Sequence, residues 1–233
     1  MKSVREYFQD FIALFFPELC AACGINLVKN ESSLCTTCIF QLPRTHFQLG
    51  AENPLAHELW GRFPFIHAGA FVYFRKGNNV QHIIHQLKYN GRHDSGFRMG
   101  ELYGLDLKHA QQGWDVDLII PVPIHPNKKD QRGYNQSECI ALGLSSVLRI
   151  PVSTNHLIKR THTSSQTKKS RLERQQNLKE SFIVQNGAEL KGKHLLLIDD
   201  VLTTGATLEA CAKALTKLDQ VHISIASIAL ATE

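Results

Sequence analysis

Residues 194–208, with the sequence HLLLIDDVLTTGATL, join an apolar segment to two carboxylates, a turn rich in hydroxyl groups and the start of a helix. Residues 195–198 are continuously apolar, which is typical of a strand that is covered on both faces in a parallel sheet. Residues 208–218 follow the turn and have the composition of a helix. This order of strand, turn and helix indicates an α/β fold that presents polar groups where the strand ends.

Two kinds of polar group follow this predicted strand. Ionised Asp199 and Asp200 only accept hydrogen bonds, which suits the two vicinal hydroxyls of a sugar. The turn consists of Thr203, Thr204, Gly205, Ala206 and Thr207. The free amides and the dipole of the helix start favour an anion, and Gly205 lets the backbone approach it closely. The pattern predicts a ribose-phosphate site, with an ordinary solvated acidic turn as the alternative. It is neither a Walker A loop nor a dinucleotide fingerprint, since it has no GK[ST] and one glycine.

The sequence IDDVLTTGAT at residues 198–207 resembles the motif with which type I phosphoribosyltransferases bind 5-phosphoribosyl-1-pyrophosphate (PRPP). The resemblance implies the fold of that family, a Rossmann-like, mainly parallel sheet flanked by helices, with a β-hairpin flap. It also implies that Asp199 and Asp200 hold the ribose 2- and 3-hydroxyls at the catalytic centre. Residues 203–207 would wrap the 5-phosphate.

The cysteines indicate a second, smaller module. Four of the six fall in two CxxC pairs, Cys20, Cys23, Cys35 and Cys38. This spacing suits a tetrahedral zinc with four thiolates, and such a closed shell predicts a structural ion. Redox disulfides and an iron–sulfur cluster are the alternatives. Cys139 and Cys211 lie among apolar neighbours and are expected to be buried.

Length and punctuation suggest the domain boundaries. The chain has 233 residues, enough for one α/β domain and a small appendage. We expect an N-terminal helix and zinc module at residues 1–50, a linker at 51–64 and a phosphoribosyltransferase-like domain at 65–233. The N-terminal apolar stripe predicts a helix that docks on one of these modules, with a membrane-surface or partner helix as the alternative. Residues 11–16 are too short for a signal or membrane span, so we expect a cytoplasmic protein.

A second candidate site follows the apolar strand predicted at residues 116–122. Prolines and cations come directly after this strand, and they form a rigid turn that presents positive charge. In type I phosphoribosyltransferases a loop in this position meets the pyrophosphate of PRPP. The resemblance therefore assigns pyrophosphate binding to the backbone of Pro123, Ile124 and His125 and to Arg132. A helix at residues 134–149 follows, with Asn135 and Ser137 as capping or phosphate-facing groups.

Residues 159–179 carry seven Lys or Arg against one acid, a net charge of +6, whereas the whole chain carries +5. The basic character is therefore local. The resemblance to type I phosphoribosyltransferases implies a mobile flap over the active site, with strands near residues 152–158 and 182–185 at its base. The flap candidates are Arg160, Gln166, Lys168, Lys169 and Arg174. Nonspecific binding of nucleic-acid phosphates and a merely solvated face are the alternatives.

Further blocks narrow the resemblance to the ComF family of phosphoribosyltransferase-like proteins. They are the two CxxC pairs, residues 87–91, 121–126 and 132–137, the spaced Arg160, Thr163, Gln166, Arg174 and Asn177, and the motif at 198–207. They cover nearly the whole chain, in order. The resemblance implies a role in uptake of external DNA, in which the zinc module and the basic patch would bind single-stranded DNA or DNA-uptake proteins.

The implied reaction is displacement of pyrophosphate from PRPP by a nitrogen nucleophile, helped by Mg²⁺. The sequence specifies no base pocket, so the acceptor is unidentified. The alternative is a catalytically silent adaptor that senses PRPP or binds DNA. A zinc-ribbon DNA-binding protein with an unrelated α/β body is disfavoured by the PRPP motif.

Overall fold

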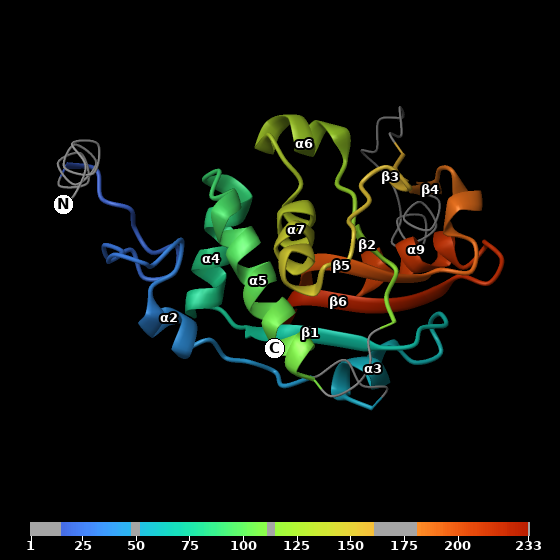
Figure 1. Ribbon diagram of the computed structural model, residues 1–233, viewed down its shortest axis with the longest axis horizontal. Helices are drawn as coiled ribbons and strands as arrows, with labels where there is room; N and C mark the ends of the chain where they lie inside the picture. Colours follow the sequence, from blue (N-terminus) through green and yellow to red (C-terminus); the bar gives the residue numbers. More distant parts are fainter. Residues whose placement is uncertain (1–14, 48–51, 111–114, 161–180, 233) are drawn as a thin grey trace, which may run out of the picture.

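The computed structural model describes residues 15–47, 52–110, 115–160 and 181–232 (Figure 1). The helix predicted near the N-terminus therefore lies largely outside the described residues. Within the described part, no helix is long and apolar enough to span a membrane.

A four-stranded sheet forms the centre of the molecule. Its strands are β1 (Ala68–Phe74), β2 (Leu118–Pro121), β5 (His194–Leu202) and β6 (His222–Ala231). The order is β1-β6-β5-β2, and each neighbouring pair is parallel. In β5, residues 195–198 are fully buried, which explains the uninterrupted apolar run. The predicted parallel α/β architecture is confirmed.

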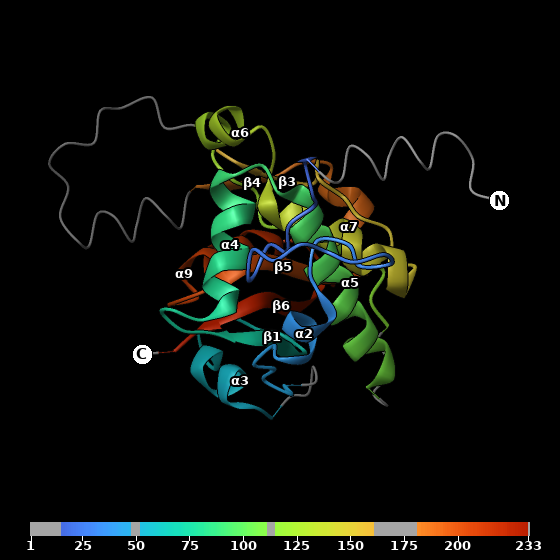
Figure 2. The same cartoon turned by 90° about the vertical axis from the view of Figure 1, so that its left-hand side faces the viewer.

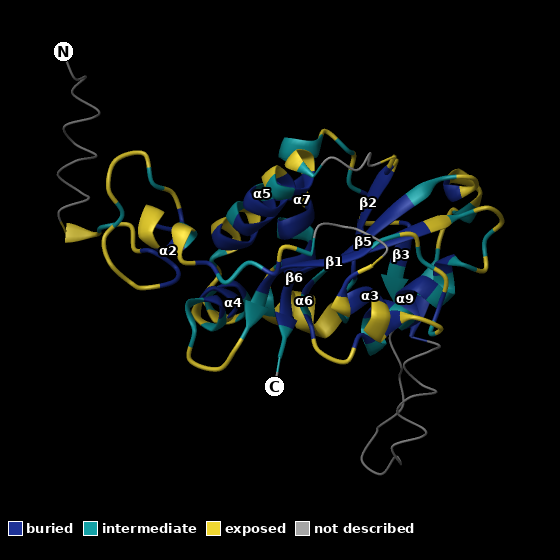
Figure 3. Cartoon of the chain, turned by 90° about the horizontal axis from the view of Figure 1, so that it is seen from below, coloured by how far each residue is buried: buried dark blue, intermediate teal, exposed yellow. Residues whose placement is uncertain are grey.

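Helices cover both faces of this sheet (Figures 1 and 3). One layer contains α4 (Asn79–Tyr89), α5 (His93–His109) and α7 (Gln136–Leu148), and the other contains α3 (Pro54–Leu59) and α9 (Ala206–Leu215). Helices α5 and α7 approach closely at two glycines. A Cβ at Gly100 would lie 2.2 Å from the Ile140 carbonyl oxygen, and one at Gly143 would lie 2.0 Å from the Phe97 carbonyl oxygen. Any larger residue there would force the two helices apart.

Helix α3 occupies the stretch for which the sequence predicted a linker. Asn53 caps the helix by accepting from the Ala56 amide at 2.9 Å, and Pro54 is its first residue. Leu55 and Leu59 are completely buried against the sheet. The expectation of a linker is thus wrong for residues 54–59. Two apolar side chains one turn apart supply a stripe that faces the core. The surrounding prolines and glycines favoured a connecting segment over a helix in the sequence.

The other predicted elements differ only in detail. Helix α9 begins at Ala206 instead of residue 208, so Ala206 and Thr207 belong to its first turn. The rigid turn expected after β2 contains a short helix, α6 (Pro126–Arg132), in which proline again takes the first position. Cys211 is buried as predicted, whereas Cys139 is only half-buried.

A small hairpin stands apart from the main sheet. Strand β3 (Leu157–Lys159) pairs with β4 (Phe182–Val184) in the antiparallel sense, and the short 3-10 helix η1 (Gly187–Leu190) follows. The hairpin predicted on either side of the basic segment is present, and its second strand agrees with the prediction, but its first strand begins at Leu157 and not near residue 152. Four of the five flap candidates, Gln166, Lys168, Lys169 and Arg174, lie outside the described residues, and the fifth, Arg160, is exposed.

The cysteine-rich segment lies at one end of the molecule, beside α4 (Figures 1 and 2). It includes α2 (Thr36–Phe40), and the chain then passes along the outer edge of β1. There the Thr45 amide donates to the Phe71 carbonyl at 3.0 Å and the Tyr73 amide donates to the Pro43 carbonyl at 2.8 Å. Its buried cysteines belong to the same apolar core as α4, α5 and α7. The segment is therefore packed against the α/β body.

Candidate functional site

The acidic pair lies near the carboxyl end of β5, next to the loop that follows β2. Pro121 at the end of β2 is in register with Ile198, and the Val122 amide donates to the Ile198 carbonyl at 2.9 Å. The loop that starts at Pro123 therefore leaves the sheet beside Asp199. Two segments that the sequence assigned separately to sugar and pyrophosphate are thus neighbours at one edge of the sheet, where ligands of open α/β folds bind.

The carboxyl group of Asp199 has two neutral hydrogen-bond donors. The Ser137 hydroxyl, in the first turn of α7, donates to Oδ1 at 3.0 Å, and the Asp200 amide donates to the same oxygen at 2.9 Å. Burial, followed by the charge of Asp200, raises the pKa of Asp199 to about 7. This carboxyl group can therefore exchange a proton near neutral pH.

Asp200 has a cationic partner that the sequence did not indicate. Lys88, in the last turn of α4, places Nζ 2.8 Å from Oδ2 of Asp200. The Lys88 side chain is 23% exposed and that of Asp200 is 12% exposed, so the pair is largely shielded from water. Lys88 belongs to the block at residues 87–91 that carries part of the family resemblance, but nothing local to Lys88 or Asp200 predicts that they meet.

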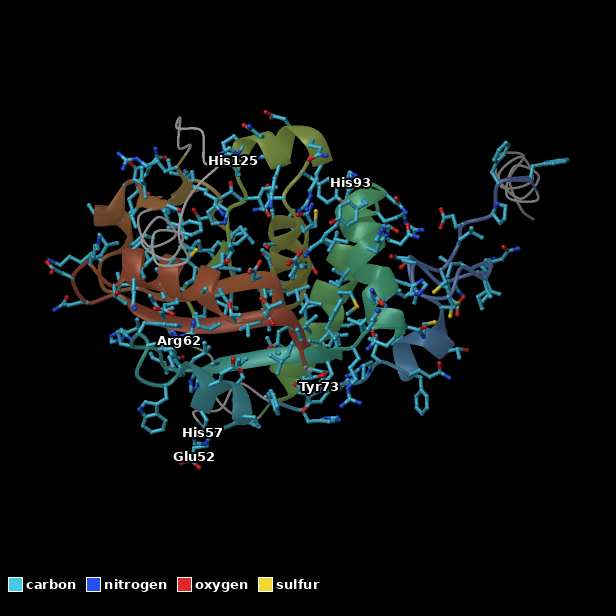
Figure 4. All side chains as sticks on the ribbon, turned by 180° about the vertical axis from the view of Figure 1, so that it is seen from behind. Glu52, His57, Arg62, Tyr73, His93 and His125 are labelled. Atoms are coloured by element: carbon cyan, nitrogen blue, oxygen red, sulfur yellow. The ribbon has the colours of Figure 1, made fainter. Side chains whose placement is uncertain are left out.

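The turn at residues 203–207, which the sequence predicts to bind phosphate, is contacted by the segment that follows α3; we refer to this turn as the predicted phosphate turn. Gly205 precedes α9 with φ of +69°, a left-handed conformation that glycine adopts without strain. Arg62 Nη1 donates to the Thr204 carbonyl at 2.8 Å, while Nε and Nη2 donate to Oε2 of Glu209 at 2.9 and 2.7 Å. A Cβ on Gly205 would lie 2.9 Å from Cδ2 of Leu59. Arg62 and Leu59 thus brace the turn, and Figure 4 shows Arg62 on the side of the sheet that carries α3.

Arg132 is held at the junction of three helices. Its Nη1 donates to Oε1 of Gln136 at 2.7 Å, and its guanidinium carbon lies 5.6 Å from the centre of the Tyr89 ring. Nearby, the rings of His93 and Tyr134 stack with their centres 4.3 Å apart. Figure 4 shows His93 and His125 at the same edge of the molecule, on either side of α6. Arg132 therefore lies beside α4 and α7, which also supply Lys88 and Ser137.

A cavity of about 230 Å³ separates the loop after β2 from the hairpin. Its lining includes Pro123, Ile124, Lys129, Asn135 and Lys159. Asn135 caps α7 and donates from Nδ2 to the Val122 carbonyl at 3.0 Å, which fixes the start of the loop. Burial lowers the pKa of Lys159, so its ammonium is a poorly hydrated cation at the base of the flap hairpin.

The four cysteines of the two CxxC pairs form a candidate metal centre. Their sulfur atoms all lie within 4.8 Å of one another, and Cys23 and Cys35 are 3.8 Å apart. Tetrahedral zinc with bonds of 2.3 Å separates its sulfur ligands by about 3.8 Å. The Cys35 amide points at Sγ of Cys20 at 3.3 Å, and the Cys38 amide points at Sγ of Cys35 at 3.4 Å, contacts that stabilise thiolates. The four sulfurs fit a structural zinc ion.

Similarity to known proteins agrees with this architecture. A family model described as "Phosphoribosyl transferase domain" matches residues 136–232. Competence protein F of Haemophilus influenzae is 30% identical over 93% of this chain and 99% of its own length. The DNA utilization protein YhgH of Escherichia coli (strain K12) is 27% identical over 84% of this chain and 83% of its own length.

Competence protein ComFC of Bacillus subtilis (strain 168) is 31% identical over a shorter stretch, 42% of this chain and 38% of its own length. The match to competence protein F extends over nearly all of both chains, and it includes the cysteine-rich segment as well as the α/β body. With its phosphoribosyltransferase fold and its close-set cysteines, this chain therefore belongs to the ComF family.

Proposed function

We propose that this protein binds PRPP and transfers ribose 5-phosphate to an unidentified nitrogen acceptor, with release of pyrophosphate, in the context of DNA uptake. One observation carries the proposal. The acidic pair on β5 is followed directly by the braced turn and the start of α9, and the loop after β2 lies beside it. Two carboxylates that can accept hydrogen bonds from a diol therefore lie between two segments that can bind anions. The names of the relatives, competence protein F and DNA utilization protein YhgH, support the biological context.

Each part of PRPP has proposed partners. Asp199 and Asp200 accept from the ribose 2- and 3-hydroxyls. The 5-phosphate accepts from the amides and hydroxyls of residues 203–207, at the positive end of α9. The pyrophosphate meets the backbone of Pro123, Ile124 and His125, the guanidinium of Arg132 and the cations of the flap.

In the proposed reaction the bond between C1 and the pyrophosphate oxygen breaks, and the acceptor nitrogen forms a bond to C1. Positive charge develops on the ribose ring, and the carboxylates of the acidic pair stabilise it. The electron pair leaves with pyrophosphate, whose charge the cationic side chains offset, and the acceptor nitrogen loses its proton to solvent. Mg²⁺ would be held by oxygens of PRPP and by water, as this ion prefers, and it would neutralise the leaving group.

We further propose that residues 1–50 are a zinc module that stabilises the fold, and that α3 belongs with the phosphoribosyltransferase-like domain at 65–233. The buried Leu55 and Leu59 support the second assignment, because they complete the apolar layer under β1. The protein would act in the cytoplasm, where thiols remain reduced and available to zinc.

A second function is supported by the basic segment at residues 159–179. A protein that binds PRPP without turnover could act as an adaptor in DNA handling, with this segment on single-stranded DNA. The enzyme and the adaptor differ in one measurable property, the release of pyrophosphate.

The test is a calorimetric titration of PRPP with Mg²⁺ into the wild type, the Asp199→Asn, Asp200→Asn double variant and the control Asp219→Asn. Asp219 is exposed beyond α9, so its variant should bind normally. Binding lost only in the double variant supports the ribose site, and an acceptor screen for pyrophosphate release then separates enzyme from adaptor. Absence of PRPP binding by folded, zinc-loaded wild type would contradict the enzyme and the PRPP-sensing adaptor, and it would leave an adaptor that binds DNA.

A further inference from the structure

The ion pair between Lys88 and Asp200 joins two distant parts of the chain at the candidate ribose site. The last turn of α4, which carries Lys88, is fixed from two sides. Leu87 is buried in the core, and its carbonyl accepts a hydrogen bond from the Tyr134 hydroxyl. The Lys88 ammonium therefore starts from an anchored backbone, and its partly enclosed side chain reaches Oδ2 of Asp200 at 2.8 Å.

The two adjacent carboxyl groups consequently have different surroundings. Asp200 faces a full positive charge, whereas Asp199 accepts from the Ser137 hydroxyl and the Asp200 amide, which are neutral donors. Among the described residues, the ionisable groups that act on Asp199 are Asp200 on the same strand, Lys88 on α4, Lys159 on β3 and Cys211 on α9.

Two buried carboxylates side by side repel each other, so the pair favours a state with one proton. The ammonium of Lys88 decides which group stays ionised, because it lies on Asp200. In agreement, burial and the charge of Asp200 raise the pKa of Asp199 to about 7. A protonated carboxyl group accepts hydrogen bonds poorly, whereas a vicinal diol offers two donors.

We propose that Lys88 is a positioning residue of the ribose site. Its ammonium holds Asp200 in place as a carboxylate. Asp199 is then the group that releases its proton when the diol of the ligand binds. This inference rests on the proposed binding of PRPP. It adds that ligand binding is linked to proton release through a residue outside the PRPP motif. The released proton passes to the buffer, so the linkage can be measured directly.

The first experiment titrates PRPP with Mg²⁺ into the wild type, Lys88→Met and Lys88→Arg, in pairs of buffers with different ionisation enthalpies. At pH 7 Asp199 is about half protonated in the wild type, so about half a proton should be released from this group, and none at pH 9. Without the ammonium both carboxyl groups hold their shared proton more tightly. If that proton affinity rises by one pH unit, the ionised fraction of Asp199 at pH 7 falls from about one half to about one tenth, so the affinity for PRPP at pH 7 should fall roughly fivefold.

The pH profile separates positioning from a merely structural role. In Lys88→Met the affinity should recover toward the wild-type value between pH 7 and pH 9, and proton release at pH 7 should rise toward one. Lys88→Arg keeps the charge and should stay within a few-fold of the wild type. The phosphates of PRPP also titrate in this pH range. Proton release and affinity are therefore compared as differences between each variant and the wild type, measured with the same ligand solution.

A loss of affinity in Lys88→Met that is equal at pH 7 and pH 9, or no loss at all, would overturn the inference while the proposed function stands. No binding of PRPP by the wild type would overturn the proposed function and with it the role of Lys88.

A second measurement keeps the inference testable if Lys88→Met does not fold. In the ligand-free wild type, carboxyl-carbon NMR should show one aspartate that titrates near pH 7 and disappears in Asp199→Asn; titration of Asp200 there instead would refute the assignment.

Discussion

Substitution of Arg62 by alanine should weaken both the fold and the predicted phosphate turn. The change removes the hydrogen bond to the Thr204 carbonyl and the two bonds to Glu209. The side chains of Arg62 and Glu209 are only 27% and 20% exposed, so these bonds are partly shielded from solvent. A hydrogen bond that involves a charged group contributes about 1.5–3 kcal/mol.

Glu209 keeps a second partner, because Nζ of Lys213 lies 2.6 Å from its Oε1. The total loss should therefore be closer to one such bond than to three, or about 2–3 kcal/mol of the free energy of unfolding. For a chain of this size that corresponds to a decrease of roughly 4–12 °C in Tm. The turn would also lose its brace, and the affinity for PRPP should fall by about tenfold, which corresponds to about 1.4 kcal/mol.

Thermal and urea denaturation measure the first effect, and calorimetric titration with PRPP measures the second. Arg75→Ala is a matched control, because Arg75 is exposed and its Nε makes one long contact of 3.4 Å to the Thr232 hydroxyl. Arg62→Lys should recover part of the stability but not the paired donation of Nε and Nη2 to Oε2 of Glu209. If Arg62→Ala matches the control in both Tm and PRPP affinity, Arg62 does not brace the turn at residues 203–207.

Three further changes have measurable consequences. Asp199→Asn should raise the free energy of unfolding at pH 8 by up to roughly 4 kcal/mol, because the raised pKa of Asp199 means that its ionised form destabilises the folded state. The gain should shrink as the pH falls from 7 toward 4. A gain in urea denaturation that stays constant over this range would contradict the assignment. Removal of zinc by a chelator should release one zinc ion per chain from the four cysteines. It should also lower Tm, since three of the four cysteines are buried in the core. An unchanged Tm after complete removal would argue against a structural ion. If the basic segment binds single-stranded DNA, the Lys168→Ala, Lys169→Ala double variant should show a weaker salt dependence. The slope of the logarithm of the binding constant against the logarithm of the salt concentration should fall in magnitude by about 1.4. An unchanged slope would exclude both lysines from phosphate contact.

Local sequence predicted the centre of the candidate site because that centre is contiguous. A buried strand, two carboxylates, a short turn and a helix start occur within fifteen residues, so backbone geometry alone places them together. The same reasoning predicted the hairpin at the base of the flap and the close-set cysteines, whose spacing within each CxxC pair limits how far apart the sulfurs can lie. The roles of the individual site residues stay predictions until ligand binding is measured.

The apolar pattern was a weaker guide where short elements lie among prolines and glycines. Helix α3 has only two fully buried leucines one turn apart, which is too little periodicity to distinguish a helix from a connecting segment. With α3 treated as a linker, Arg62 had no reason to be considered, although it contacts a residue 142 positions away. The sequence signal that could have revealed it was the cap of Asn53 followed by Pro54.

The sequence by itself therefore determined the parallel α/β architecture, the acidic pair with the turn that follows it, and the four-cysteine motif, because each depends on periodicity or on spacing within a short segment. The tertiary structure alone decided which cation lies on Asp200, what supports the predicted phosphate turn, and how the loop after β2 meets β5. Those contacts depend on the order of strands in the sheet and on the packing of α3, α4 and α7 around it. Such long-range contacts have no fixed spacing in the chain, so no local pattern encodes them.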